Sequence, residues 1–206
     1  MALYAVAERR LRPGQLDAYL AALRALDAQL ADRSARGPYT VYVAEADPDQ
    51  VLGLGLWRGV EDLEETLAAV PAELAARLDA TVAEGEWQWE WYDSVRQVRS
   101  FAGTASLVAA ARFRVDPARL VPFYGWARRI QDRSIALPGV LTMHLLESRT
   151  EEGAFIHLAE YDSHEARRIA LELIDANPPP TPLVGLRRFL GRRSYHWDRF
   201  APRPAK

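Results

Sequence analysis

The amino-acid sequence predicts an α+β fold made of two copies of one unit, each with the order strand, helix, strand, strand, helix, strand. The apolar patterns found between Leu3 and Tyr92 return in the same order between Leu107 and Phe200. The 206 residues are 49% hydrophobic and 26% charged, which is typical of a globular protein with a core of its own. Residues at corresponding places also match: Leu16 with Leu120, Arg24 with Arg128, and Trp57 with Tyr161.

The first copy begins with an alternating strand that turns at Pro13-Gly14 into a helix with a clear apolar stripe. Gly37-Pro38 ends the following connection, and Asp47-Pro48-Asp49 supplies the turn of a hairpin. Trp87, Trp89 and Trp91 alternate, as expected of a final strand. The expected elements are strands at 4–11, 39–43, 51–57 and 87–91, and helices at 16–30, 61–70 and 73–82.

The second copy repeats this order. Asp116 is a suitable N-cap and Pro117 a suitable first residue for its first helix, and Ser163 is expected to cap a helix that ends before the prolines at 178–180. The expected elements are strands at 107–113, 140–146, 154–161 and 194–200, and helices at 117–130, 163–176 and, more briefly, 183–190. We therefore expect repeats at 1–95 and 105–200, a linker at 96–104 and a tail at 201–206.

This order of elements predicts a ferredoxin-like βαββαβ sheet with helices on one face. Several central strands are apolar on both faces, for example Leu52, Leu54 and Leu56 together with Ile156 and Leu158. Such strands need cover on both sides. The two sheets are therefore expected to pack face to face within one molecule.

Composition excludes several classes of function. The chain has no cysteine, which excludes disulfides, thiol nucleophiles and cysteine-based zinc sites. The N-terminal sequence shows no basic leader followed by a long apolar run, and no segment approaches the roughly 20 apolar residues of a membrane span. We expect a cytoplasmic protein with no membrane partner. A homodimer of the whole chain is compatible with the sequence.

The charge is divided unevenly between the halves. Residues 1–103 hold 17 acidic and 10 basic residues, whereas residues 104–206 hold 11 acidic and 16 basic residues. One interpretation is that opposite charges help the halves to dock. The other is that the second half attracts an anionic ligand, which its four arginine pairs favour. The near-neutral total and the lack of a recognised binding motif argue against nucleic acid as a partner.

All four histidines lie in the second half, at 144, 157, 164 and 196. If the second hairpin turns between Thr150 and Glu151, His144 and His157 face each other across neighbouring strands. Such a pair is a candidate catalytic general base with a polarising partner. The alternatives are a purely structural pair, or a metal site completed by Glu160, His196 or Asp198. No closely spaced metal-binding motif supports the metal site, so we expect no metal and no bound cofactor.

Aromatic and basic residues suggest where a substrate binds. Tyr124, Trp126 and Arg128 lie on the first helix of the second copy, where they could line a cleft between helix and sheet. Tyr161 ends the third strand of that copy, and it is the fourth candidate for substrate binding. The alternative for all of these residues is packing, since large aromatic side chains are usually part of a core.

The strand-to-helix steps Trp57-Arg58-Gly59-Val60-Glu61 and Tyr161-Asp162-Ser163-His164-Glu165 resemble the corresponding step in the dimeric α+β barrel superfamily, especially its antibiotic biosynthesis monooxygenase branch. The resemblance covers nearly the whole chain, twice. It implies two fused barrel subunits that form an intramolecular dimeric α+β barrel. It also implies a small-molecule ligand and the activities of relatives: cofactor-independent oxygenation, haem degradation or isomerisation.

The sequence departs from those relatives at their functional residues. Oxygenases and haem-degrading members of the superfamily use an asparagine beside the substrate, but the one asparagine here, Asn177, lies in a proline-rich loop. Haem degradation is therefore disfavoured. The remaining hypothesis is a monooxygenase-like enzyme that oxygenates or isomerises an aromatic or polyketide-like substrate in the second repeat. The alternative is a non-catalytic ligand-binding or stress-related protein of the same fold.

Overall fold

The computed structural model describes residues 3–30, 36–57, 59–83, 90–100 and 105–197. They divide into two compact units, the first comprising Met1–Trp91 with Ser194–Lys206 and the second comprising Tyr92–Arg193. In chain order the elements are β1 (Leu3–Arg10), α1 (Leu16–Leu30), β2 (Arg36–Ala44), β3 (Gln50–Trp57), α2 (Val60–Ala68), α3 (Ala72–Thr81), β4 (Glu90–Arg99), β5 (Leu107–Arg114), a 3₁₀ turn (Pro117–Arg119), α4 (Leu120–Ser134), β6 (Val140–Ser148), β7 (Ala154–Tyr161), α5 (His164–Asp175) and β8 (Val184–Trp197).

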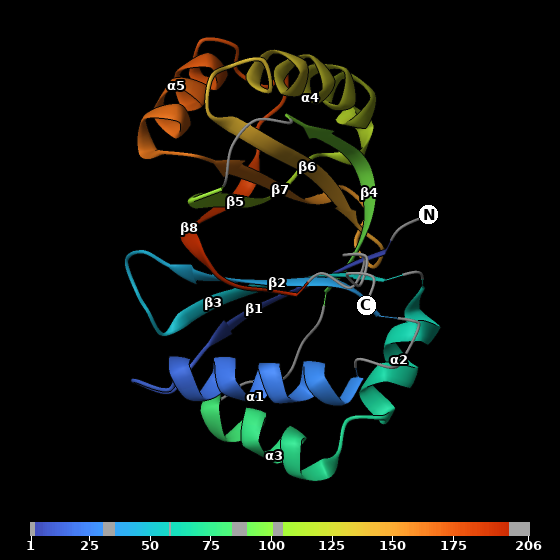
Figure 1. The fold of residues 1–206 in the computed structure, drawn as a ribbon. Coiled ribbons are helices and arrows are strands. Elements are labelled where there is room, and N and C mark those ends of the chain that lie inside the picture. The colour runs from blue at the N-terminus through green and yellow to red at the C-terminus, as the bar shows by residue number, and fades with distance from the viewer. Residues whose placement is uncertain (1–2, 31–35, 58, 84–89, 101–104, 198–206) are drawn as a thin grey trace, which may run out of the picture. The chain divides into compact units, whose positions relative to one another are not determined.

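In the first unit, β3 lies between β1 and β2 and pairs antiparallel with both. Helices α1 and α3 cover one face of this sheet (Figure 1). Apolar residues spaced three and four apart place one stripe of α1 on the sheet, which is why the helix forms here. The resulting core contains Leu11, Tyr19, Leu20, Leu23, Tyr39, Val41, Val51 and Leu78.

In the second unit the strand order is β8-β5-β7-β6-β4, and every pairing is antiparallel. The first four strands of this order are the ferredoxin-like arrangement, with β4 added beside β6. Helices α4 and α5 lie on one face of the sheet (Figure 1). The predicted α+β class is confirmed, and the predicted ferredoxin-like order is confirmed for the second unit. The predicted packing of the two sheets on each other stays a prediction.

The prediction of a short helix at 183–190 is wrong, because residues 184–190 belong to β8. The spacing of Leu183, Leu186 and Leu190 resembles a helical stripe, but β8 pairs with β5, with Leu190 opposite Ala109. Gly185 has a φ of +64° and lies where the register of this pair shifts, as a bulge glycine does. Hydrogen bonding to the edge of β5 therefore outweighs the weak helical pattern.

The predicted start of the linker at residue 96 is also wrong. Arg96 to Arg99 are part of β4, where Arg99 pairs with Thr142 of β6. Residues 101–104 lie outside the described part of the chain, as do Trp87 and Trp89. Trp91 packs against the cluster of Leu3, Ala5 and Trp57. Trp91 therefore has a packing role. Among the described residues, no helix is long and apolar enough to cross a membrane.

Both caps predicted for the second unit are present. Asp116 Oδ1 accepts a hydrogen bond from Ala118 N at 2.9 Å, and Ser163 Oγ accepts one from Ala166 N at 3.2 Å. Replacing Ser163 with alanine removes the cap of α5 and is expected to lower the free energy of unfolding by about 1 kcal/mol. Chemical denaturation measures this change. Ser163→Thr keeps the hydroxyl and should recover most of the loss; equal losses in both variants would contradict a capping role.

Candidate active site

A cavity of about 200 Å³ lies in the second unit, between the sheet and helices α4 and α5. Its floor is formed by small side chains on neighbouring strands, Ala109 and Ala111 of β5 and Ala159 of β7. Larger side chains at these positions would fill the space beneath the helices, so the alanines leave room for a ligand. The walls are largely apolar and include Phe113, Phe123, Ile130, Leu171, Ile174 and Leu190. We call this space the apolar cavity.

A cluster of aromatic rings packs around one part of the apolar cavity. The ring centroids of Phe123 and Phe155 are 4.9 Å apart, and Phe113 lies 5.8 Å from each of them. Ring pairs at such distances stabilise a fold by more than the burial of their apolar surface alone. The cluster fixes α4 against β5 and β7, which makes the nearby wall rigid.

His157 is the imidazole of the apolar cavity. It lies on β7 two residues before Ala159, so both side chains project to the helix-covered face of the sheet. Burial lowers the pKa of His157 to about 4, and the nearby His144 lowers it further. His157 is therefore neutral at pH 7 and has a ring nitrogen able to accept a proton.

Tyr161 and Arg167 line the same cavity. Burial raises the pKa of Tyr161 to about 12, while Arg167 acts in the opposite direction, so the phenol stays protonated and can donate a hydrogen bond. The Nε of Arg167 is buried and, within the described part of the chain, has no hydrogen-bond partner. These donors can stabilise a negative charge that forms on a ligand oxygen.

Gln131 of α4 adds an amide that the sequence analysis missed. It is only 2% exposed, and neither its Oε1 nor its Nε2 has a hydrogen-bond partner among the described residues. A buried polar group without a partner costs about 1–3 kcal/mol. The signal was present in the sequence, since Gln131 follows Phe123 and Ala127 at four-residue spacing and so falls on the buried stripe of the helix.

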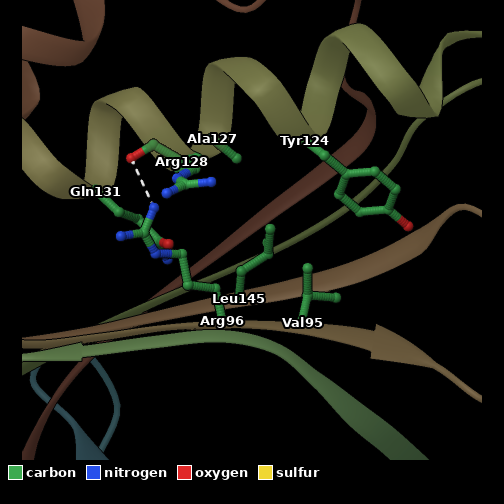
Figure 2. Close-up of a pocket in the computed structure, with 7 residues that line it drawn as sticks. All are labelled: Val95, Arg96, Tyr124, Ala127, Arg128, Gln131 and Leu145. Atoms are coloured by element: carbon green, nitrogen blue, oxygen red, sulfur yellow. Dashed lines mark hydrogen bonds between the residues drawn. The ribbon is translucent and has the colours of Figure 1, made fainter.

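A second cavity, of about 360 Å³, lies between the same helix and strands β4 and β6. Figure 2 shows Arg96 and Arg128 gathered beside Gln131 at one end of this space and Tyr124 at the other. We call it the basic cavity. The Tyr124 hydroxyl donates a hydrogen bond of 2.7 Å to Glu147 Oε2, and burial and this carboxylate together raise the pKa of the phenol.

The structure divides the predicted substrate-binding residues between these two cavities. Trp126 and Tyr161 line the apolar cavity, whereas Tyr124 and Arg128 line the basic cavity. The indole Nε1 of Trp126 donates a hydrogen bond to the backbone oxygen of Asn177, and Arg133 donates one to the Asn177 side chain. The one asparagine of the chain thus connects the end of α5 to α4, which is a structural role.

The prediction that His144 and His157 face each other is wrong, because the register of the hairpin differs by one residue. In the β6–β7 hairpin His144 pairs with Leu158, and His157 pairs with Leu145. Because successive side chains of a strand alternate between faces, the two imidazoles point to opposite faces of the sheet. Only His157 lines the apolar cavity; the catalytic role predicted for His144 as its direct partner has no geometric support.

On its own face of the sheet, His144 lies among charged groups. Burial lowers its pKa to about 4, with Glu160 opposing the shift and Arg99 adding to it. Glu160 accepts a hydrogen bond from Thr142 at 2.8 Å and forms an ion pair with Arg193. Within the described residues no group of three or more histidine or acidic side chains could hold a metal ion. Asp198 and the side chain of His196 lie outside that part of the chain.

No protein-family model matches the sequence, and the comparison with curated proteins finds no match. Solved structures do match. A candidate monooxygenase from Fusobacterium nucleatum has a TM-score of 0.76 at 11% identity, over 96% of this chain and 94% of that one. An anthrone oxidase-like protein has a TM-score of 0.63 at 15% identity, over 100% of this chain and 96% of that one.

A third solved structure matches with a lower TM-score. It is an uncharacterised ferredoxin-fold protein from Listeria monocytogenes that is related to antibiotic biosynthesis monooxygenases, with a TM-score of 0.54 at 12% identity over 95% of each chain. At these identities the comparisons establish a fold. The chain has the α+β fold of antibiotic biosynthesis monooxygenase-like proteins, so the resemblance seen in its strand-to-helix steps is confirmed.

Proposed function

We propose that the second unit is a monooxygenase-like small-molecule enzyme that acts on an acidic aromatic or polyketide-like substrate in the apolar cavity. The observation that carries this proposal is the position of His157, a neutral imidazole in a largely apolar cavity that Tyr161, Arg167 and Gln131 also line. A base and several hydrogen-bond donors around one cavity are what proton abstraction beside a carbonyl group requires.

The proposed reaction starts with transfer of a proton from the substrate to His157. The negative charge then rests on the substrate oxygen, where Tyr161 and the Nε of Arg167 donate hydrogen bonds. A base of pKa about 4 that takes a proton of pKa about 10 works against a gap of six pKa units, or about 8 kcal/mol. A turnover of about 10 s⁻¹ corresponds to an activation free energy of about 16 kcal/mol. The free-energy cost of the proton transfer lies well below this value, so the step is compatible with such a turnover for an acidic substrate.

Two outcomes follow from the resulting carbanion. Return of the proton from His157 to another carbon isomerises the substrate. Reaction with dioxygen instead forms a carbon–oxygen bond, and loss of water then converts the methylene group to a carbonyl group: CH₂ + O₂ gives C=O + H₂O. Dioxygen accepts all four electrons, so this reaction balances without a further reductant.

We propose further that the first unit is a copy of the second in which the ligand space is filled. Leu3 pairs with Trp57, and Leu107 pairs with Tyr161, at a constant offset of 104 residues. At this offset Gly53 corresponds to His157 and Gly55 to Ala159. A Cβ added at Gly53 would lie 2.4 Å from the Tyr39 hydroxyl oxygen, so the Tyr39 ring lies directly on this part of the sheet.

The test is turnover of anthrone, an aromatic ketone with an acidic methylene group. Purified protein in air-saturated buffer is expected to convert anthrone to anthraquinone with uptake of one dioxygen per product, measured by absorbance, an oxygen electrode and mass spectrometry. The rate must exceed the spontaneous oxidation measured with heat-denatured protein. No rate above that background for anthrone or for hydroxylated anthrones would contradict the oxygenation.

The low pKa of His157 also favours a second candidate function, which is ligand binding without catalysis. A weak base buried among apolar walls can serve only as a hydrogen-bond acceptor for a bound hydroxyl group. This function predicts saturable binding of anthraquinone, measured by calorimetry, together with anthrone oxidation no faster than the spontaneous rate. Turnover above background would exclude it.

A further inference from the structure

The apolar and basic cavities meet along one side of α4. Three residues, Ala127, Gln131 and Leu145, line both of them. Ala127 has a small side chain, so the separation between the two spaces at this point depends mainly on Gln131 and Leu145. A ligand that spans both cavities would therefore have to displace the Gln131 and Leu145 side chains, which are nearly fully buried.

The two cavities differ in their chemistry, although Arg167 and Arg188 also line the apolar cavity. The apolar cavity has an alanine floor and largely apolar walls, which suit a planar hydrocarbon body. At one end of the basic cavity two guanidinium groups, those of Arg96 and Arg128, lie together beside Gln131 (Figure 2). Arg96 forms an ion pair with Asp132 and donates a hydrogen bond of 3.1 Å to the Arg128 backbone oxygen. Within the described part of the chain no carboxylate pairs with Arg128, so this end carries a net positive charge.

Gln131 supplies the second observation, independent of the arginines. It is buried and sits where the cavities meet, with a donor and an acceptor that no described residue satisfies. A ligand that offers a carbonyl and a neighbouring hydroxyl, or one group able to do both, would satisfy this amide.

We propose that one ligand occupies both cavities: a planar aromatic body in the apolar cavity, a polar substituent on the Gln131 amide, and an anionic substituent, such as a carboxylate, beside Arg128 and Arg96. The proposal rests on the proposed function in using the same apolar cavity, and it narrows the substrate class to aromatic acids. The fork of an arginine side chain matches the two oxygens of a carboxylate, which makes it the suitable partner for such a group.

Calorimetry with two probes that share the anthraquinone body, one with an anionic and one with a neutral substituent, tests this proposal. Anthraquinone-2-carboxylate is expected to bind the full-length protein about fivefold to tenfold more tightly than 2-(hydroxymethyl)anthraquinone. The preference should shrink as salt is raised, because the arginine end is open to solvent. Equal affinities of the two probes at low salt would overturn the proposal.

Variants then locate the charge preference. Arg128→Gln should bring the affinity ratio close to one, mainly by weakening the binding of the carboxylate. The matched control is Arg129→Gln, which removes the same charge from the next residue of α4 and should keep the preference, since Arg129 lines neither cavity. A preference that survives in Arg128→Gln would overturn the role of the basic cavity.

Gln131→Leu tests the position where the cavities meet. Both probes should bind at least tenfold more weakly, while the melting temperature of the ligand-free protein should not fall, because the change removes a buried amide without partners. Unchanged binding would overturn the assignment of Gln131. Failure of this proposal is distinguishable from failure of the proposed function: tight binding of the alcohol without a charge preference, accompanied by anthrone turnover, contradicts only the anionic substituent.

Discussion

Replacing His157 with glutamine is expected to lower turnover of anthrone by about 10²–10⁴-fold, the range that a positioned general base contributes. Glutamine retains a polar group of similar reach but cannot take up a proton. The fold should persist, which circular dichroism and thermal unfolding measure. Because the base must be neutral, kcat/KM of the wild-type protein should stay constant from pH 8 to about 5 and fall as pH drops through the His157 pKa of about 4.

His164→Gln is the matched control for this prediction, because it makes the same replacement at an exposed residue on α5, outside the apolar cavity. Its turnover should equal that of the wild-type protein. Equal turnover in the wild-type protein and His157→Gln would remove His157 from the mechanism. An equal loss in His144→Gln and His157→Gln would show that chemistry depends on both faces of the sheet, contrary to the proposed site.

Acidification is expected to destabilise the protein strongly through its two buried histidines. The pKa values of His144 and His157 are about 4 in the folded protein, against an ordinary value of 6.5. Between pH 6.5 and 4 the unfolded chain binds more protons than the folded protein does. The contribution of the two histidines to the free energy of unfolding is therefore fully present above pH 6.5 and is lost as the pH falls through this window. Each histidine should cost about 2 kcal/mol by pH 5 and about 3 kcal/mol below pH 4.

Urea denaturation of the wild-type protein and of His144→Gln and His157→Gln at pH 7 and pH 5 measures this loss. Titrating carboxylates contribute alike to all three proteins, so the difference between wild type and variant isolates one histidine. Each variant should lose about 2 kcal/mol less than the wild-type protein over this pH interval. Equal losses in all three proteins would show that neither imidazole is held neutral by the fold.

The sequence predicted the elements whose signals are local. The stripe of α1, the caps at Asp116 and Ser163, and the alternating strands of both hairpins depend on neighbouring residues alone, and the structure contains them. The errors lie where pairing between distant segments decides the conformation. Residues 183–190 form a strand because β5 offers them an unpaired edge, and residues 96–99 form a strand because β6 does. A helical spacing of three leucines carries no information about such an edge.

The candidate site was predicted in part, and the missing part has one physical cause. The chemistry of Trp126, His157 and Tyr161 indicated them as site residues, and all three line the apolar cavity. The sequence also indicated the second half of the chain as the place of the site. The β6–β7 register is centred on Glu151 rather than between Thr150 and Glu151. Gly153, with a φ of +75°, belongs to this turn, whose geometry the strand patterns do not specify. A slip of one residue moved His144 to the other face.

The placement of the Tyr39 ring over Gly53 has a consequence for solution measurements. If the first unit is a copy of the second, as proposed above, the Tyr39 side chain occupies the place in the first unit that corresponds to His157, so only the second unit offers a site. Titration should therefore give a stoichiometry of one molecule per polypeptide. The saturation curve should be a simple hyperbola, with a Hill coefficient of about 1, since a single site has no twin with which to cooperate.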